Sequence, residues 1–384
     1  MKKALPAAGV LVSLIVATAL STAPAQAEGV PVAAAAGEVV AGEYIVTTRP
    51  GTAARVSGQR AGGSTMHVYE HAMHGFAAKL TPGQLRAVQR DRDVLAIEPN
   101  QAVGIGVESV QSPTPNWGLD RIDQRNLPLN NSYTYFNTGR GVTAYVIDTG
   151  INVTHPDFGG RAAVAYDALG GNGLDCNGHG THISGIVGSS TYGVAKQVQL
   201  RAVRVLDCNG SGSFAGVIAG VNWVQANSPG PSVALMALGG SRNASVDAAV
   251  NSLAASGVFI SVSAGSSAAD ACNFSPAGAS GAFSVIRSTQ TDQSPSTNNY
   301  GPCVKLHAPG TNITSTWLGT GTATLSGTAM AAAHVAGVAA MFKQAVNDVP
   351  NSVVNAFLLG VATSGVLTGV HPQNPNLLLY TNLI

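Results

Sequence analysis

The sequence predicts an α/β protein with a mostly parallel sheet, preceded by a small α+β domain. From about residue 116 onward, apolar segments rich in Val, Ile and Ala alternate with helical patterns. These segments are continuously apolar, which is typical of parallel strands covered on both faces. The chain has 384 residues, which is enough for one large domain and a smaller one.

The N-terminus has the pattern of a secretion signal. Lys2 and Lys3 precede an apolar stretch at residues 10–20, and Ala25-Gln26-Ala27 forms a small-x-small cleavage site. A membrane anchor is the alternative, but an apolar stretch of about eleven residues is much shorter than the roughly 20 that span a bilayer. We therefore expect residues 1–27 to be removed and the protein to be extracellular. We identify no later segment long and apolar enough to span a membrane.

Residues 28–42 are rich in Ala, Val and Gly and are expected to form a leader. A small α+β domain is then expected over residues 43–103. It contains short strands at 44–46, 74–80 and 94–98, and a helix that Thr81 caps and that runs through Val88. Residues 104–115 are expected to link it to the next domain.

The larger domain is expected to cover residues 116–384 and to carry the parallel sheet. Its predicted strands are residues 143–147, 198–206, 233–238, 258–263 and 304–306. Its predicted helices are residues 179–187, 215–225, 246–255, 328–346 and 353–362.

Composition argues against several classes of protein. The net charge is +1 and only 10% of residues are charged, so a nucleic-acid partner is not expected. A nucleotide-binding domain is disfavoured because no Gly-x-Gly-x-x-Gly follows the first strand. The four cysteines lack the Cys-x-x-Cys spacing of zinc sites. An exported chain can instead form disulfides, and four cysteines allow three connectivities.

Two polar positions stand where catalytic residues of α/β proteins occur. Asp148 ends a buried strand, and active sites of open α/β sheets lie at the carboxyl ends of strands. His179 lies in the run Asn177-Gly178-His179-Gly180-Thr181-His182, at the expected start of a helix. A metal site is a weaker interpretation, because the only nearby carboxylate is Asp175.

A third segment identifies the family that the chain resembles. Residues 326–337 read Ser-Gly-Thr-Ala-Met-Ala-Ala-Ala-His-Val-Ala-Gly, which closely resembles the nucleophile segment of the subtilisin-like serine proteases. Along the chain, Asp148 comes first, the run Gly-His-Gly-Thr-His at residues 178–182 follows, and this segment comes last. This order resembles the Asp, His, Ser order of the catalytic residues in that family. Residues 75–80 and 94–99 also resemble its propeptide. The resemblance runs from about Glu43 to Ile384 and is closest to the proteinase K and aqualysin type.

The resemblance implies a three-layer subtilisin-like domain whose propeptide acts as a folding template and intramolecular inhibitor. It implies that Asp148 orients His179 and that His179, rather than His182, is the general base. Ala329 stands at the position of the serine nucleophile, and Ser266 at that of the oxyanion-hole asparagine. The cysteines are implied to pair sequentially, as Cys176–Cys208 and Cys272–Cys303.

The groove for an extended peptide is also implied by resemblance. Its edge corresponds to Ser211 and Gly212, and the walls of the primary pocket correspond to Ala237, Leu238, Gly239, Ala264 and Gly265. Catalysis in this family needs no cofactor. Structural calcium is common in the subgroup, but Thr289 stands where one ligand is expected and Asp292 is out of register, so the ligands are unknown.

We expect the protein to be a monomer. Two candidate functions remain for it. The chain is either a subtilase-like protein that binds peptides or its own propeptide without cutting them, or an active endopeptidase in which Ala329 is an engineered change. Because Ser266, Ala237 and Ala333 also depart from the family pattern, we favour lost catalysis.

Overall fold

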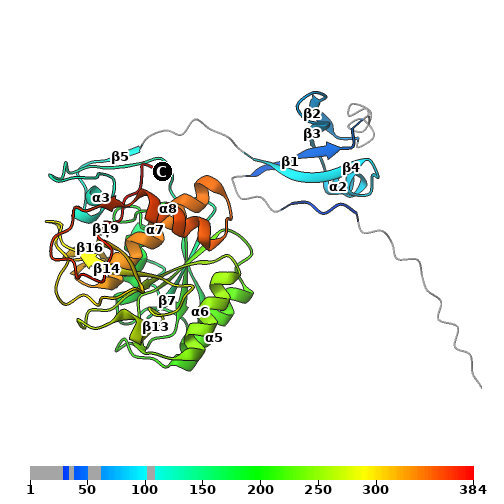
Figure 1. The fold of residues 1–384 in the computed structure, drawn as a ribbon. Helices are drawn as coiled ribbons and strands as arrows, with labels where there is room; N and C mark the ends of the chain where they lie inside the picture. The colour runs from blue at the N-terminus through cyan, green and yellow to red at the C-terminus, as the bar shows by residue number, and fades with distance from the viewer. Residues whose placement is uncertain (1–28, 34–38, 51–61, 102–108) are drawn as a thin grey trace, which may run out of the picture. The chain divides into compact units, whose positions relative to one another are not determined.

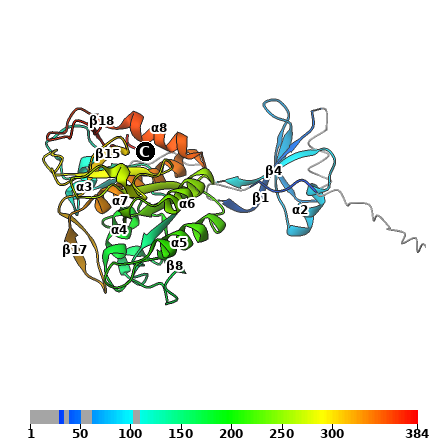
Figure 2. The same ribbon diagram turned by 60° about the horizontal axis from the view of Figure 1, so that its bottom comes forward.

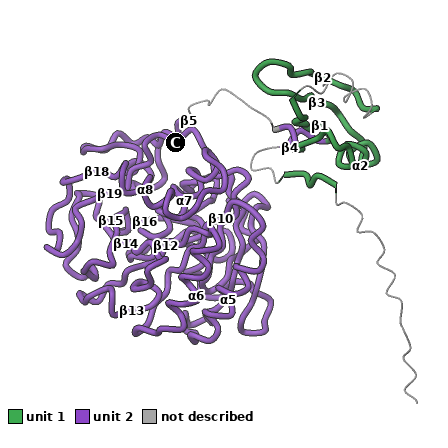
Figure 3. The backbone as a smooth tube through the Cα atoms, turned by 45° about the vertical axis from the view of Figure 1, so that its right-hand side comes forward, with its two compact units in different colours: residues 1–33, 42–98 green, residues 34–41, 99–384 purple. Residues whose placement is uncertain are grey.

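The computed structural model describes residues 29–33, 39–50, 62–101 and 109–384, which divide into two compact units (Figures 1 and 3). The smaller unit contains the described parts of residues 1–33 and 42–98. The larger contains those of residues 34–41 and 99–384. The expected signal peptide of residues 1–27 lies outside the described residues, as do parts of the expected leader and linker.

The smaller unit is a four-stranded sheet in the order β2-β3-β1-β4 with one helix. Thr81 caps that helix as predicted: its side chain accepts from the Gln84 N–H, and the Gln84 Oε1 accepts from the Thr81 N–H at 2.8 Å. Buried Val46, Phe76 and Ile97 are part of the core. The elements are β1 (Val39–Thr48), β2 (Ser64–Tyr69), β3 (Gly75–Lys79), α2 (Pro82–Gln89) and β4 (Val94–Gln101).

The larger unit is built on a nine-stranded sheet in the order β18-β19-β15-β14-β12-β10-β7-β9-β8. Every neighbouring pair is parallel except β18 and β19, which confirms the expected α/β class. The strands are β7 (Thr143–Asp148), β8 (Ala162–Asp167), β9 (Gln199–Arg204), β10 (Ser232–Met236), β12 (Phe259–Ser263), β14 (Phe283–Ser288), β15 (Val304–Pro309), β18 (Thr363–Ser364) and β19 (Leu377–Leu378). Of these, β8, β14, β18 and β19 were not predicted.

Helices cover both faces of this sheet, with α4 and α7 on one face and α5 and α6 on the other (Figures 1 and 2). The sequence of strand β7 is largely apolar because side chains on both of its faces are buried. Ala144 and Val146 join the core under α4 and α7, and Tyr145 and Ile147 join the core under α5 and α6. The helices are α3 (Trp117–Ile122), α4 (His179–Gly188), α5 (Phe214–Ala226), α6 (Ala244–Ala255), α7 (Thr328–Val346) and α8 (Asn351–Val361).

Short elements complete the larger unit. Strand β5 (Ser109–Gln111) falls inside the expected linker of residues 104–115 but pairs with β6 (Tyr133–Tyr135), so this part of the linker is ordered by a strand far along the chain. The other short elements are the pair β11 (Gly240–Ser241) and β13 (Phe274–Ser275), the pair β16 (Ile313–Thr316) and β17 (Thr322–Leu325), and the 3₁₀ turns η1 (Pro156–Phe158) and η2 (Ala271–Asn273).

Helix α7 corrects one expectation from the sequence. It is 19 residues long and apolar enough to cross a membrane by length and composition. However, 83% of its apolar window is buried inside the larger unit, where it packs against β10, β12, β14 and β15. Its apolar character therefore reflects a place in the protein core.

Candidate active site

Asp148 and His179 form a contact at the carboxyl end of the sheet. Asp148 is the last residue of β7 and is fully buried. Its Oδ1 accepts from the N–H of Thr149 at 2.8 Å and lies 2.7 Å from Nδ1 of His179, the first residue of α4. A carboxylate at Nδ1 fixes the imidazole with Nε2 left for other partners.

Burial and the neighbouring carboxylates shift the pKa of His179 in opposite directions. Burial is the largest single influence and lowers the pKa, but the charge and hydrogen bond of Asp148, with a further contribution from Asp175, raise it more. The net result is a pKa above the usual value. The side chain keeps 27% of its surface exposed, so this basic imidazole remains accessible.

Asp175 holds the loop that positions His179, a role that the sequence did not reveal. Its Oδ1 accepts from the Thr149 hydroxyl and from the N–H groups of Asn177 and Gly178, each at 2.9 Å. Its Oδ2 accepts from the N–H of Thr181 at 2.9 Å and from its hydroxyl at 2.6 Å. Both oxygens of the Asp175 carboxylate therefore accept hydrogen bonds from this loop and the start of α4. In the described part of the chain, no group of three or more His, Cys, Asp or Glu residues is able to hold a metal.

The loop also depends on Gly178. Its φ of +108° is one that side chains rarely adopt, and a Cβ there would lie 2.4 Å from the ring of Trp317. His182, three residues after His179, points elsewhere. Its Nε2 lies 3.1 Å from the carbonyl of Ile313 and 3.0 Å from that of Ala323, and burial lowers its pKa to about 4. His179 is thus the histidine that contacts Asp148.

Ala329 lies in the first turn of α7 and is 9% exposed. The two neighbouring hydroxyls are bonded to other groups. The Thr328 Oγ1 accepts from the Gly265 N–H at 3.2 Å, and the Ser326 Oγ accepts from the Asn312 N–H at 2.8 Å while donating to its Oδ1 at 3.1 Å.

Ser266 is exposed and follows Ala264 and Gly265 in the turn after β12. Gly265 has a φ of +98°, and a Cβ there would lie 2.5 Å from Nδ2 of Asn299. That amide donates to the Ala264 carbonyl at 2.7 Å, and its Oδ1 accepts from the Ser267 N–H at 2.8 Å. Asn299 therefore fixes the backbone of this turn, another role that sequence inspection missed.

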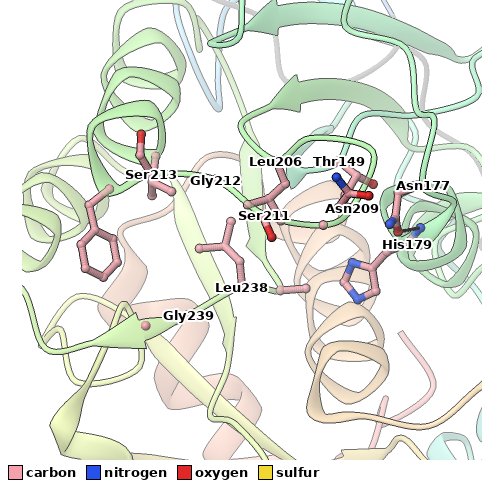
Figure 4. Close-up of a pocket in the computed structure, with 15 residues that line it drawn as sticks. Thr149, Asn177, His179, Leu206, Asn209, Ser211, Gly212, Ser213, Leu238 and Gly239 are labelled. Atoms are coloured by element: carbon pink, nitrogen blue, oxygen red, sulfur yellow. Dashed lines mark hydrogen bonds between the residues drawn. The ribbon is translucent and has the colours of Figure 1, made fainter.

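A cavity of about 630 Å³ opens beside His179, whose ring points into it (Figure 4). Five of the seven expected peptide-binding residues line it, whereas Ala264 and Gly265 do not. Those five are Ser211, Gly212, Ala237, Leu238 and Gly239. The lining also includes Leu206, Phe214 and Val217, which were not predicted and which contribute an apolar end.

The comparisons with known proteins agree with this geometry. The subtilase family model matches residues 139–375, which is more than half of the chain, and the peptidase inhibitor I9 model matches residues 43–105. The chain belongs to the subtilase family. The inhibitor match indicates that the smaller unit of this subtilase is a propeptide domain of the inhibitor type.

Curated relatives and a solved structure support the assignment of this subtilase. It is 48% identical over 319 residues to alkaline serine exoprotease A of Vibrio alginolyticus, covering 82% of this chain and 60% of that protein. It is 48% identical over 318 residues to the extracellular serine proteinase of Thermus sp. strain Rt41A, covering 82% and 77%. It is 37% identical over 366 residues to proteinase R of Parengyodontium album, covering 93% of each. The crystal structure of a cold adapted subtilisin-like serine proteinase matches with a TM-score of 0.69 and 48% identity, covering 70% of this chain and 99% of that one.

Two disulfides brace the subtilase domain, and they are the sequential pairs that the resemblance implied. Cys176–Cys208 joins the loop before His179 to the loop that carries Ser211. Cys272–Cys303 joins η2 to the start of β15. The first disulfide therefore ties the two sides of the cavity together, and a hydrogen bond of 2.9 Å from the Asn177 Nδ2 to the Cys208 carbonyl reinforces it.

Proposed function

We propose that this subtilase is a secreted peptide-binding protein in which hydrolysis has been disabled at more than one position. The observation that carries the proposal is Ala329 in the first turn of α7, where the family places its nucleophile, with the hydroxyls of Ser326 and Thr328 both bonded elsewhere. His179 is left as a base without a hydroxyl to activate. In subtilisin, loss of the serine lowers kcat by a factor on the order of 10⁶.

Ser266 supports the loss of catalysis at a second position. Its hydroxyl is on a shorter side chain than the asparagine amide that supplies an oxyanion donor in the family, and it is exposed. Loss of one such donor costs about 10²–10³ in kcat. The cavity beside His179 has no Asp, Glu, Lys or Arg in its lining and retains a form suited to an extended peptide, with Ser211 and Gly212 along its edge.

Restoring the lost groups distinguishes the two functions. We expect Ala329→Ser alone to hydrolyse a short peptide amide about 10²–10³ times more slowly than Ala329→Ser combined with Ser266→Asn. Equal, full activity of the single and double variants would overturn the proposal and favour an ordinary endopeptidase with one engineered residue. The intact Asp148–His179 contact is the observation that favours that second function.

Peptide binding has its own test, which uses a glycine that can accept a side chain. A Cβ at Gly239 would lie 3.5 Å from the Ser275 carbonyl, an ordinary contact, so Gly239→Val should fill the cavity and leave the fold intact. We expect it to lower the affinity for a fluorescent extended peptide at least tenfold. Gly230→Val is the matched control, because a Cβ there meets nothing within 4 Å. Equal affinities of the two variants would contradict binding at this cavity.

The smaller unit is proposed to remain attached after export as an intramolecular inhibitor. Self-cleavage needs the nucleophile that Ala329 lacks, so the exported protein should keep its propeptide. Intact mass decides this: a product that starts near residue 28 supports the proposal. A product that starts near Val110 indicates cleavage, by the chain itself or by another protease.

We also propose that structural calcium binds to the loop of residues 120–134. The Asp123 Oδ1 is buried and has no hydrogen-bond partner in the described part of the chain, and burial, with a smaller effect of the Asp120 charge, raises the pKa of Asp123 to about 6. Two buried carboxylates suit a hard cation. Asp292 does not fit this role, since Arg121 binds its carboxylate with two hydrogen bonds of 2.8 and 3.0 Å.

A further inference from the structure

The two disulfides of this subtilase differ in their access to solvent. Cys176 and Cys208 are both exposed, whereas Cys272 and Cys303 are half-buried. Cys303 also packs against a buried cluster that includes Ile286. Thiol–disulfide exchange needs a thiolate to reach a sulfur, so the exposed pair is the more accessible to a reductant in solution.

A guanidinium contacts both sulfurs of the exposed pair. The Arg204 Nη2 lies 3.3 Å from Sγ of Cys176 and 3.8 Å from Sγ of Cys208. The rest of the guanidinium is held in place, because Nε donates to the Leu206 carbonyl at 3.3 Å and Nη1 to the Asp167 Oδ2 at 3.4 Å. A cationic N–H donor stabilises the thiolate that forms when the S–S bond breaks, which makes that sulfur a better leaving group.

The half-buried pair has no equivalent contact. Arg242 lies close to it, but its Nη1 donates to the Cys272 carbonyl at 2.8 Å and its Nε to the Asp247 Oδ2 at 3.0 Å. Among the residues that the structure describes, no side-chain donor contacts either sulfur of this pair. Each disulfide therefore has an arginine nearby that is paired with an aspartate, but only Arg204 contacts sulfur.

The carboxylates that precede the exposed cysteines are bonded to backbone groups. The Asp207 Oδ1 accepts from the N–H groups of Asn209 and Ser211, each at 2.9 Å. Asp175 accepts from the loop before His179, as described above. Neither carboxylate therefore takes the place of Arg204 at the sulfurs.

This disulfide is also the covalent link between two walls of the peptide cavity. Asn177 and Asn209, which follow the two cysteines, both line the cavity (Figure 4). Apart from the disulfide, one hydrogen bond joins these two loops in the described structure, from the Asn177 Nδ2 to the Cys208 carbonyl at 2.9 Å. Opening the S–S bond leaves the wall that carries Ser211 with little to fix it against the loop of His179.

We propose that Cys176–Cys208 is a site of thiol–disulfide exchange, and that its reduction by an external dithiol loosens the peptide cavity. A thiolate of the dithiol attacks Sγ of Cys208 and forms a mixed disulfide. The S–S electron pair leaves on Sγ of Cys176, the sulfur closer to Arg204. The second thiolate of the dithiol then displaces Cys208. The dithiol is oxidised to a disulfide, and its two electrons and two protons pass to the cysteines.

Reduction of the native full chain with dithiothreitol, followed by alkylation and peptide mass analysis, tests the exchange. We expect Cys176 and Cys208 to be alkylated at least about tenfold faster than Cys272 and Cys303. This comparison needs no variant, because the two disulfides are read in the same molecule. Equal rates for the two pairs, or faster reduction of the half-buried pair, would overturn the proposal.

The role of Arg204 is tested by Arg204→Gln, which should slow reduction of the exposed pair by a factor of about three to ten. Arg204→Lys keeps the positive charge and should recover much of the rate. Arg242→Gln is the matched control and should leave both rates unchanged, since Arg242 contacts a carbonyl rather than a sulfur. An unchanged rate in Arg204→Gln, or equal slowing in Arg242→Gln, would contradict the assignment.

Hydrogen exchange tests the loosening without any peptide. The amides of Asn209 and Ser211 should exchange about tenfold faster after reduction, while those of β10 keep their rate. Unchanged exchange at both amides, or a matching increase in β10 that marks general unfolding, would overturn the loosening.

The effect on ligands rests on the proposed peptide binding. Affinity for a fluorescent extended peptide should fall about tenfold on reduction and recover on reoxidation, because the cavity loses a constraint that holds it ready for the ligand. An affinity that reduction leaves unchanged would refute this effect. If the oxidised chain binds no peptide, the proposed function fails, whereas alkylation and hydrogen exchange still decide the exchange site and the loosening.

Discussion

Three buried histidines should make the larger unit sensitive to acid. His182, His307 and His334 are each fully buried, and burial lowers the pKa of each to about 4 from the usual 6.5. In the unfolded chain they take up protons near pH 6.5, but in the folded chain only near pH 4. The free energy of unfolding is therefore undiminished above pH 6.5, falls as the pH drops from 6.5 to 4, and levels off below that.

The size of the loss follows from these pKa values. Each histidine lowers the free energy of unfolding by about 2 kcal/mol between pH 7.5 and pH 5, so the three together give about 6 kcal/mol. Asp123 acts in the opposite direction, because its raised pKa of about 6 makes protonation favour the folded state, worth about 1.4 kcal/mol at pH 5. The raised pKa values of His179 and Asp120 oppose the loss too, so we expect a net decrease smaller than about 4.6 kcal/mol.

Equilibrium denaturant unfolding between pH 7.5 and pH 5, in calcium-free and non-reducing buffer, measures this decrease. Fluorescence of Trp117, Trp223 and Trp317 reports on the larger unit, which contains all three tryptophans of the chain. His307→Gln should reduce the pH dependence by about 2 kcal/mol over this interval. A free energy of unfolding that stays constant or rises as the pH falls to 5 would refute the reasoning, as would a His307→Gln variant with unchanged pH dependence.

Three further predictions concern stability. The Cys176–Cys208 disulfide closes a loop with a sequence separation of 32 residues, so replacing both cysteines by serine should lower the free energy of unfolding by about 3–4 kcal/mol. Denaturant titration measures this loss, and a value below about 1 kcal/mol would contradict the prediction. Asp292→Ala leaves the buried Arg121 charge without its carboxylate and should cost about 3–5 kcal/mol in the same assay, whereas a neutral effect would show that the pair contributes little. Calcium should raise the Tm of the full chain, and Asp123→Asn should abolish that rise in calorimetry. A variant that still responds would place the ion elsewhere.

Much of the fold could be predicted from local patterns. The bounds of α7 and the start of α4 were predicted correctly, because long apolar periodicity and a Gly-rich helix start are local signals. Strands β8 and β14 were not predicted. Strand β8 lies at the edge of the sheet, and three of its six residues are alanines, which have little preference for strands. Strand β14 includes Ser284 and Arg287, which make a short run look like a loop.

The candidate site divides in the same way. Motif order in the sequence was enough to name Asp148 and His179, and the structure places them in contact. The supporting roles of Asp175 and Asn299 were not visible, because each binds several backbone groups and hydroxyls that only the folded loop gathers around it. Single polar residues in Gly-rich loops carry no pattern that distinguishes such a role.

The sequence by itself determined that position 329 carries no hydroxyl, since alanine ends in a methyl group in any conformation. Only the tertiary structure decided which groups the neighbouring hydroxyls bond. Thr328 is bonded to the backbone of Gly265 and Ser326 to Asn312, and each partner comes from another segment of the chain. The identity of a side chain fixes its reactive groups, but the direction of a hydroxyl depends on partners that folding brings together.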